Sequence, residues 1–476
     1  MSRPFYITTP IYYPNANLHM GHAYSTTVAD IIARYERLMG REVYFLTGAD
    51  ENTEKVVRVA KVEGKDVANY LEEITSNFRS LFSKLNISYD QFIRTSDEKQ
   101  HWPGAIALWR RIEEKGDLEK RTYKGLYCVG HEAFITEKEL VNGKCPDHGE
   151  APQALEEQNW FFKLSRYTGE IRAKIESGEL IIQPETRRNE ILALLERGLE
   201  DVSFSRSADK VSVGIPVPND STQKMYVWCD ALANYISALG FGTSDDVLFK
   251  KFWPADVHLI AKDILRFHAA IWPGMLLSAG LPLPKKILVH GYIKSEGEKM
   301  SKSLGNVVDP LKIVEEYGTD ALRYYLARHI HPFEDSDFTM EKFKEVYNAN
   351  LANGLGNLVS RVMKMAETYL SEPVKIPANT IPQGFKDAMD TRNIQQAADT
   401  IWRKISEADE LIQKTEPFKL VKTDKEKGVG IIRGLVVDVY TIARMLNPFM
   451  PETMEKIKQA VKDNKMPPHS LFARKE

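Results

Sequence analysis

The sequence predicts an α/β protein whose parallel sheet is interrupted by an insertion and followed by an all-α bundle. Three observations lead to this fold class. A strand, a helix and a second strand follow one another at the start of the chain, strand patterns return after about residue 225, and helical spacing dominates after about residue 347. Strand–helix–strand order is typical of a βαβ unit, whose ligand site lies at the carboxyl ends of the strands.

The first unit is defined by three neighbouring segments. Residues 5–13 are rich in β-branched and aromatic side chains and predict a strand, although Pro10 lies within it. Apolar residues then recur at helical spacing from about Met20 to Met39, and Gly40 supplies a stop signal. A second strand is predicted over residues 42–47. A ligand site is therefore expected just after residue 13.

The alternation of strands and helices is interrupted in the middle of the chain. Short strands, turns and a helix-like run over 187–199 indicate an insertion. The strand pattern is expected to return at Met225 to Asp230, with Tyr226 and Trp228 on one face, and to continue at 257–260 and 287–291. The predicted parts are a first half of the sheet domain over 1–116, an insertion over 117–225, a second half over 226–292, a linker over 293–349 and a helical domain over 350–476.

Composition excludes several classes of protein. The chain has 476 residues, with 64 Lys+Arg against 66 Asp+Glu, so any contact with nucleic acid must come from local patches. No apolar run approaches the roughly 18 residues that span a bilayer, so we expect no membrane segment. The strand pattern begins directly after Met1 to Pro4, which leaves no room for a leader and predicts a cytoplasmic protein.

The first chemical motif is His19-Met20-Gly21-His22, placed where the first strand turns into the first helix. Backbone N–H groups at a helix start attract phosphate, and two imidazoles can donate hydrogen bonds to phosphoryl oxygens. Gly21 has no Cβ, so a purine ring can lie directly on the backbone there. The plainer alternative is a pair of surface histidines at a turn.

The second motif is Lys299-Met300-Ser301-Lys302-Ser303, which follows the strand predicted at 287–291. That position places it at the same sheet edge as the histidines, where two mobile ammonium groups can close over a triphosphate. The plainer alternative is a solvated basic turn. The two motifs together are far more specific than either alone.

Two short ligand pairs lie in the insertion, Cys128-x-x-His131 and Cys145-x-x-His148. Two thiolates and two imidazoles at this spacing satisfy a tetrahedral structural zinc. Such a closed site leaves no position for a substrate, so its role would be structural. A metal-free knuckle held by packing and hydrogen bonds is the alternative.

With both motifs in this order, the sequence resembles the class I aminoacyl-tRNA synthetases, which carry them around a split Rossmann-type sheet with an inserted knuckle-bearing connective domain. Within them it resembles the methionyl-tRNA synthetases, through Thr47 to Asp50, Tyr226 to Asp230, Lys262 to Ile264 and Asn350 to Arg361. The resemblance implies an ATP-dependent methionine–tRNA ligase. Methionine and ATP would give methionyl-adenylate and pyrophosphate, and methionine would then pass to the 3′-terminal adenosine of tRNA(Met).

The resemblance also implies roles for particular residues. His19, His22, Lys299 and Lys302 would be catalytic. ATP, with Mg²⁺, would be bound by these four together with Gly21 and Asp263. Methionine would be bound by Ile11, Tyr13, Trp228, Tyr235, His268 and Trp272, with Asp50 receiving its α-ammonium group. The anticodon would be read by Asn357, Arg361 and Phe418, the last at a position where the family has Trp.

Besides Phe418, the sequence departs from the family in four places. Family knuckles usually have Cys-x-x-Cys where this chain has His131, and some relatives have lost the metal. Glu51-Asn52-Thr53 follows Asp50 where His-Gly is common, and Ala261 stands where Gly is usual. Since the sequence ends just past the predicted helical bundle, we do not expect the appended C-terminal domain that dimerises some relatives. We therefore expect a monomer.

Two other functions are considered. One is a class I synthetase for another amino acid, such as isoleucine or cysteine, but the chain has no length for a large editing insertion and its aromatic pocket is oversized for cysteine. The other is a silent RNA-binding paralogue. Loss of a catalytic histidine or lysine would indicate it, and all four are present.

Overall fold

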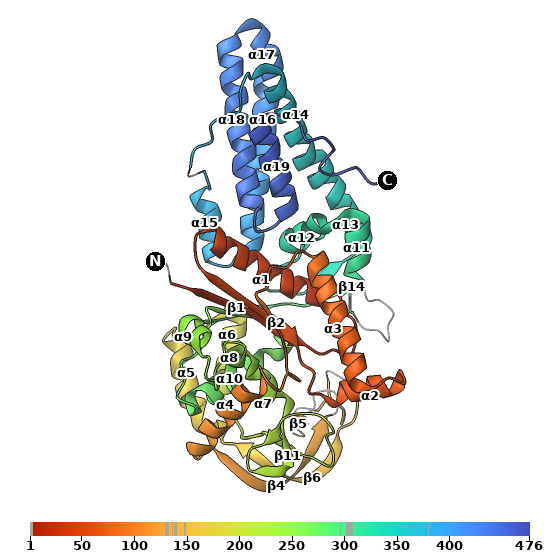
Figure 1. Cartoon of the computed structure of the whole chain (residues 1–476), viewed down its shortest axis with the longest axis vertical. Coiled ribbons are helices and arrows are strands. Elements are labelled where there is room, and N and C mark those ends of the chain that lie inside the picture. Colours follow the sequence, from red (N-terminus) through yellow and green to blue (C-terminus); the bar gives the residue numbers. More distant parts are fainter. Residues whose placement is uncertain are drawn as a thin grey trace.

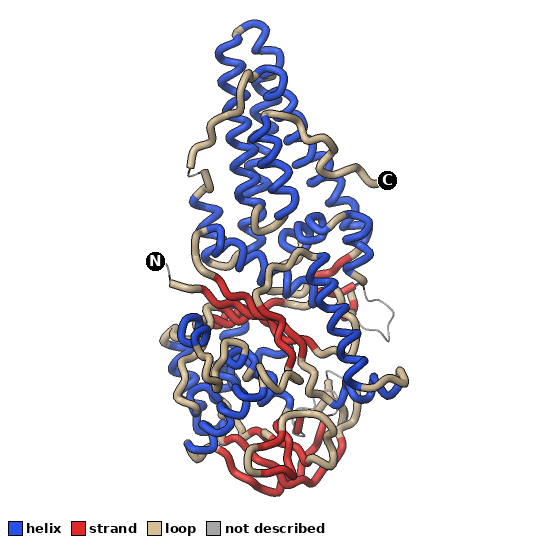
Figure 2. Tube along the Cα trace, viewed as in Figure 1, coloured by secondary structure: helices blue, strands red, loops and turns tan. Residues whose placement is uncertain are grey.

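The computed structural model describes residues 3–128, 133–135, 137, 140–146, 149–295, 297–300, 308–378 and 380–476. A six-stranded sheet lies at its centre, with every neighbouring pair parallel (Figure 2). Its spatial order is β3 (Gln91–Arg94), β2 (Val43–Ala49), β1 (Phe5–Tyr12), β12 (Val257–Ala261), β13 (Lys286–His290) and β7 (Ile181–Gln183).

Helices cover both faces of this sheet (Figure 1). Alternate residues of β1 face opposite sides, so that Phe5 and Ile7 join one hydrophobic core while Tyr6 joins the other. The first core contains α1 (Met20–Leu38) and α3 (Val67–Lys84), with the short α2 (Glu54–Val62) between them in sequence; the second contains α4 (Trp102–Glu114), α8 (Asn234–Ser237), α9 (Val247–Phe252) and α10 (Trp272–Ser278).

The predicted βαβ unit is confirmed. The strand expected at 5–13 is β1, the helix expected from Met20 to Met39 is α1, and the strand expected at 42–47 is β2. The chain leaves β1 toward β2 and β3 on one side, and later adds β12 and β13 on the other. This places a topological switch point between β1 and β12, where the crevice of an open parallel sheet forms.

The insertion forms its own sheets at the far end of the molecule (Figure 1). One holds β5 (Ala133–Ile135), β4 (Leu118–Cys128), β6 (Gln153–Phe162) and β8 (Val202–Ser203), and another holds β10 (Pro216–Val217), β11 (Asp220–Met225) and β9 (Ser205–Ser207). Its helices are η2 (Leu164–Tyr167), α5 (Thr168–Glu176) and α6 (Glu185–Glu196). The strand β7, although it lies within 117–225, pairs with β13 and so belongs to the central sheet.

The prediction of a strand from Met225 to Asp230 is wrong. The chain is extended only up to Met225, the end of β11, and then turns at Tyr226 into the helix α7 (Val227–Leu232). Five of the six α7 residues are buried, Asp230 among them, so the helix has no solvent-exposed polar face. A short run without an exposed polar face cannot be told from a buried strand by its periodicity.

The C-terminal part is the predicted helical bundle, and it rises from the α1 side of the sheet (Figure 1). Its helices are α14 (Asn357–Tyr369), α15 (Gln383–Asp390), α16 (Ile394–Thr415), α17 (Pro417–Thr423), α18 (Lys425–Leu446) and α19 (Pro451–Asp463). No helix among the described residues is both long and apolar enough to cross a membrane.

The sheet and the bundle are connected by a smaller set of elements. They are β14 (Ile293–Ser295), β15 (Glu298–Lys299), α11 (Pro310–Tyr317), α12 (Thr319–Arg328), β16 (Ser336–Phe338), α13 (Met340–Val346) and the π-helix η5 (Tyr347–Gly356).

A fully buried ion pair joins α1 to this connecting region. Arg323 of α12 lies 2.7 Å from the Asp30 carboxylate, and both side chains have no exposed surface. The same guanidinium donates hydrogen bonds to the carbonyls of Leu85, Pro448 and Phe449. Burial alone raises the pKa of Asp30, but its cationic and hydrogen-bonding partners outweigh that effect and hold this pKa below its usual value.

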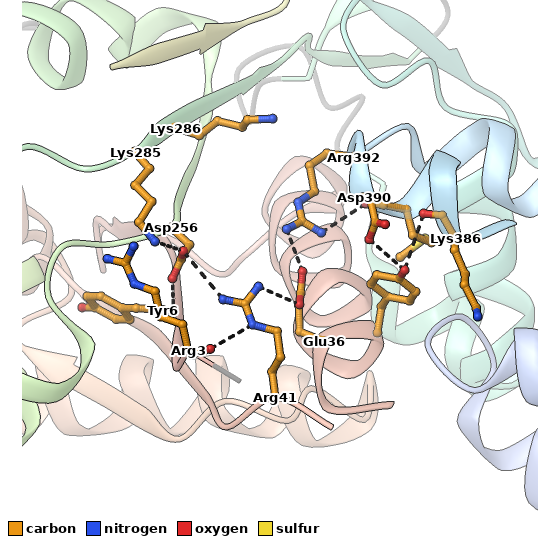
Figure 3. A network of polar contacts seen from close by, with 12 residues as sticks. Arg3, Tyr6, Glu36, Arg41, Asp256, Lys285, Lys286, Lys386, Asp390 and Arg392 are labelled. Atoms are coloured by element: carbon orange, nitrogen blue, oxygen red, sulfur yellow. Dashed lines mark hydrogen bonds and ion pairs between the residues drawn. The ribbon is translucent and has the colours of Figure 1, made fainter. Parts of the chain in front are cut away.

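A second set of ion pairs lies at the C-terminal end of α1 (Figure 3). Glu36 accepts hydrogen bonds from Arg392, just beyond α15, at 2.7 Å and from Arg41 at 3.0 Å. Arg41 also lies 3.9 Å from Asp256, directly before β12, and Asp256 is paired with Lys285 and accepts from the backbone N–H of Tyr6 at 2.9 Å. These contacts fix α1 between the sheet and the bundle.

We predict that Arg323→Leu lowers the free energy of unfolding by about 3 to 5 kcal/mol, because it leaves the buried Asp30 carboxylate without its main counter-charge. Urea unfolding at neutral pH measures the loss. Arg172→Leu is the control, because Arg172 pairs with Glu176 at the exposed surface and the loss of a solvent-screened pair should change the stability much less. Equal losses in the two variants would contradict the prediction.

Candidate active site

A cavity of about 390 Å³ lies at the switch point, beyond the carboxyl ends of β1 and β12. Segments that follow β1, β2, β12 and β13, together with α7 and α8, supply its walls. Ten of the residues predicted from the sequence line it: Ile11, Tyr13, His19, Gly21, His22, Asp50, Trp228, Tyr235, Asp263 and His268.

The two histidines of the first motif form the start of α1. The backbone N–H of Gly21 donates to Nδ1 of His19 at 3.0 Å, and the backbone N–H of His19 donates to Nδ1 of His22 at 3.1 Å. Burial, and then the neighbouring His19, lower the pKa of His22 well below its usual value. His22 is therefore neutral near pH 7 and carries its proton on Nε2, because its Nδ1 already accepts a hydrogen bond.

Gly21 has a packing role at this turn. A Cβ at this position would come within 2.9 Å of the His19 imidazole. Any larger residue would therefore displace the ring that caps α1. The sequence predicted that Gly21 makes room for a purine. The structure shows that Gly21 also makes room for the His19 ring.

One wall of the cavity is aromatic. Trp228 of α7 stacks on Phe267 with ring centroids 3.8 Å apart and an interplanar angle of 9°. Tyr235 of α8 lies beside His268, which is on the π-helix η4 (Phe267–Ile271) after the short helix η3 (Lys262–Ile264). Trp272 does not line the cavity; it is fully buried behind Tyr235, with ring centroids 5.9 Å apart.

A polar pair is set into this wall. Nδ1 of His268 lies 2.9 Å from the carbonyl of Ile264, and its Nε2 lies 2.7 Å from the hydroxyl of Tyr235. Burial lowers the pKa of His268 to about 4, so the ring is neutral. Its Nδ1 must then be the donor to the carbonyl, and Nε2 accepts from the tyrosine. The wall is thus polar at this point without carrying charge.

Asp50 follows β2 and is the carboxylate that borders this wall. Only 4% of the residue is exposed, its backbone N–H donates to the carbonyl of Tyr12 at 3.0 Å, and Oδ1 lies 3.4 Å from the Thr95 hydroxyl. The β1–β2 pairing therefore holds the carboxylate at the cavity edge.

The lysine motif approaches the same cavity. Its first residue, Lys299, ends β15, which pairs antiparallel with β14, and the next residue, Met300, lines the cavity. The side chain of Lys299 and all of residues 301–307, including Lys302, lie outside the described part of the chain. The backbone of the second motif thus comes to the cavity that the first motif lines.

Sequence reasoning missed His290 and the residues after it. His290 ends β13, and its Nε2 lies 2.7 Å from the hydroxyl of Ser25 on α1. Tyr292 and Ile293 also line the cavity. Their position was available in principle, because β13 was predicted and the carboxyl ends of neighbouring parallel strands share one edge.

The three predicted anticodon residues lie on the bundle. Asn357 and Arg361 are on α14, and Arg361 pairs with Asp409 at 2.9 Å. Phe418 is the second residue of α17 and is 39% exposed, so it is not part of the core. Arg361, Tyr369 and Phe418 border a surface hollow of about 430 Å³.

Two of the four predicted zinc ligands are described. Cys128 ends β4 and Cys145 follows a tight turn, and they are only 2% and 1% exposed. His131 and His148 lie outside the described residues. Within the described part, no three Cys, His, Asp or Glu side chains come together as a metal site.

The chain matches two family profiles. One, described as "tRNA synthetases class I (M)", matches residues 5–154 and 138–363. The other, described as "Anticodon binding domain of methionyl tRNA ligase", matches residues 366–471.

Curated relatives and solved structures agree with these matches. The methionine–tRNA ligase of Caldanaerobacter subterraneus subsp. tengcongensis is 43% identical over 472 residues, which is 96% of this chain and 74% of the relative. The methionine–tRNA ligase of Clostridium perfringens is 43% identical over 471 residues, which is 96% of this chain and 73% of the relative. The structure of Mycobacterium tuberculosis methionyl-tRNA synthetase in complex with methionyl-adenylate has a TM-score of 0.90 and 36% identity, over 99% of this chain and 100% of that one.

Proposed function

Since the chain belongs to the methionyl-tRNA synthetase family of the class I aminoacyl-tRNA synthetases, we propose that it is a methionine–tRNA ligase that works in two steps at the cavity described above. Methionine first reacts with ATP to form methionyl-adenylate and pyrophosphate. Methionine then passes to the 3′-terminal adenosine of tRNA(Met), and AMP leaves.

One observation supports the proposal above all others. The cavity gathers the two imidazoles of the first motif, a buried carboxylate, an aromatic wall and Met300 of the second motif, which come from separate parts of the chain. Such a set can hold an amino acid by its ammonium group and side chain while a phosphoryl group reacts beside it.

Methionine would lie along the aromatic wall. A thioether is apolar and polarisable, so the rings of Tyr13, Trp228 and Tyr235 suit it, and Ile11 adds apolar surface. The Asp50 carboxylate would receive the α-ammonium group. His268 would fix the Tyr235 hydroxyl, and Trp272 would support that ring from behind.

ATP would lie over the start of α1, as its Mg²⁺ complex with the metal held mainly by the nucleotide's own phosphates. The methionine carboxylate attacks the α-phosphorus in line, and the bond to pyrophosphate breaks. The Nε2–H groups of His19 and His22 would donate to phosphoryl oxygens as charge develops, and Lys299 and Lys302 would neutralise the departing pyrophosphate. Asp263 would contact the nucleotide. No enzyme nucleophile is required.

In the second step a ribose hydroxyl of the tRNA attacks the methionyl carbonyl, and the bond to AMP breaks. The bundle would select the tRNA through its anticodon. Asn357 and Arg361 are four residues apart on α14, so they share one helix face. The exposed ring of Phe418 offers a surface on which an unstacked base can lie.

The thiols of Cys128 and Cys145, with His131 and His148, form a donor set suited to one structural zinc. Both cysteines are buried, as thiolate ligands of a closed tetrahedral site are. Zinc here would stabilise the knuckle of the insertion and would take no part in the reaction.

We predict that the protein catalyses ATP–pyrophosphate exchange with methionine and with no other standard amino acid. His22→Ala should lower this exchange rate by a factor corresponding to about 3 to 4 kcal/mol, because a hydrogen bond to the developing charge is lost. His469→Ala is the control, since His469 is exposed on the bundle. Exchange with another amino acid, or an unchanged rate in His22→Ala, would refute the assignment.

We predict about one equivalent of zinc in protein purified without added metal, measured by elemental analysis. Cys145→Ser should lose the metal and lower the melting temperature, because binding free energy at a structural site is folding free energy. Cys229→Ser is the control for metal content, since Cys229 is buried in α7 and belongs to neither of the two ligand pairs. Less than about half an equivalent in the unmodified protein would contradict the proposal.

We predict that Phe418→Ala lowers kcat/KM for charging tRNA(Met) by about tenfold and leaves ATP–pyrophosphate exchange unchanged, because stacking on one base contributes about 1 to 3 kcal/mol. Phe418→Trp should retain charging. Met340→Ala, which removes another exposed apolar side chain, is the control. Loss of exchange activity in Phe418→Ala would show that the ring acts on folding instead.

A further inference from the structure

A buried polar network lies directly behind the cavity, and none of its members lines it. Asp230 of α7 is fully buried, and its Oδ2 accepts a hydrogen bond from the amide of Asn52 at 2.7 Å. Its Oδ1 lies 2.5 Å from Nε2 of His101, whose Nδ1 lies 2.8 Å from the hydroxyl of Ser237 on α8. His101 is also fully buried.

The network connects the two sides of the proposed methionine site. Asn52 lies two residues after Asp50 in the loop that follows β2. Asp230 lies two residues after Trp228 on α7, and residues at that spacing on a helix point to different sides. Trp228 therefore faces the cavity while Asp230 is buried in the network. The Asn52–Asp230 hydrogen bond joins the loop of the carboxylate to the helix of the aromatic wall.

The end of β3 fixes the same loop. The Asn52 amide also donates to the carbonyl of Thr95 at 2.9 Å, while the Thr95 hydroxyl accepts from the backbone N–H groups of Glu51 at 2.8 Å and Asn52 at 3.2 Å. Trp102, in the first turn of α4, donates to the same carbonyl at 3.0 Å. The loop is thus held on one side by β3 and on the other by α7.

The helix α8, which also contributes to the aromatic wall, packs closely against α4. A Cβ added to Gly104 of α4 would lie 2.5 Å from Cβ of Ser237, so α4 and α8 are in direct backbone contact there. His101, which precedes α4, connects this contact to Asp230. Both α7 and α8 are therefore positioned through the Asp230 carboxylate.

We propose that Asn52 and Asp230 are positioning residues that set the distance between the carboxylate of Asp50 and the aromatic wall carrying Trp228. Neither touches the cavity, and each acts through its neighbour in the chain. An amino acid bound by its ammonium group at one end and its side chain at the other depends directly on this distance. ATP, bound at the start of α1, does not. This inference rests on the proposed function and extends it.

The test is the steady-state kinetics of ATP–pyrophosphate exchange in Asn52→Asp. This isosteric change places a second carboxylate against Asp230, and we expect the KM for methionine to rise by about tenfold or more, since hydrogen bonds to buried charged groups are worth one to two powers of ten. The KM for ATP and the number of active sites found by titration should stay unchanged. A purely structural role would instead reduce the number of active sites and leave the KM of the remaining ones unaltered.

Three further variants complete the design. Combining Asn52→Asp with Asp230→Asn restores one donor and one acceptor between the two positions, and it should recover part of the methionine KM. Asn52→Ala, which adds no charge, should raise this KM by about three- to tenfold and serves if the charged variant does not fold. Asn69→Asp makes the same chemical change on the exposed surface of α3 and should alter nothing.

The outcomes distinguish a failure of the proposed function from a failure of the positioning role. No exchange with methionine in the unmodified protein overturns the proposed function. Normal exchange, with the methionine KM unaltered in both Asn52 variants, overturns only the positioning role. A rise in the methionine and ATP KM values together, without recovery in the double variant, also overturns it.

Discussion

The pairing of β1 with β12 is the constraint on which the site depends. Ile7 lies beside Val257 and Thr8 beside His258 in parallel register, and the Thr8 hydroxyl lies 2.7 Å from Nδ1 of His258, although the two residues are 250 positions apart. The turn that carries His19 and His22 follows β1, and the segment that carries Asp263 and His268 follows β12. Without this pairing the two halves of the cavity would have no common edge.

Burial then decides the character of the cavity walls. His22, His268 and His290 each have a lowered pKa, in every case chiefly because burial penalises the charged ring. Backbone and side-chain hydrogen bonds fix which nitrogen of His22 and of His268 carries the proton. The site consequently holds oriented dipoles that need no reorganisation when charge develops on a substrate. Formal charge is confined to a few groups such as Asp50.

Long-range contacts keep this arrangement rigid. The Asp30–Arg323 pair holds the middle of α1 against α12, while Glu36 and Arg392 hold its C-terminal end against the bundle. The helix that begins with the two histidines is therefore clamped at two further points along its length. The domain expected to meet the anticodon is built onto the same helix. Any displacement of the bundle must act on α1 through these buried charges.

Local patterns in the sequence were enough to predict β1, α1, β2 and the long helices of the bundle, because alternation and helical spacing are properties of neighbouring residues. The same local reasoning failed at Met225 to Asp230, where a short helix is buried and has no solvent-exposed polar face. The two motifs also identified the cavity, and ten of the predicted site residues line it. Only the tertiary structure placed Trp272 behind the wall, added His290 to it and exposed Phe418. These facts depend on which strands and helices become neighbours across the fold, and no short stretch of sequence encodes that.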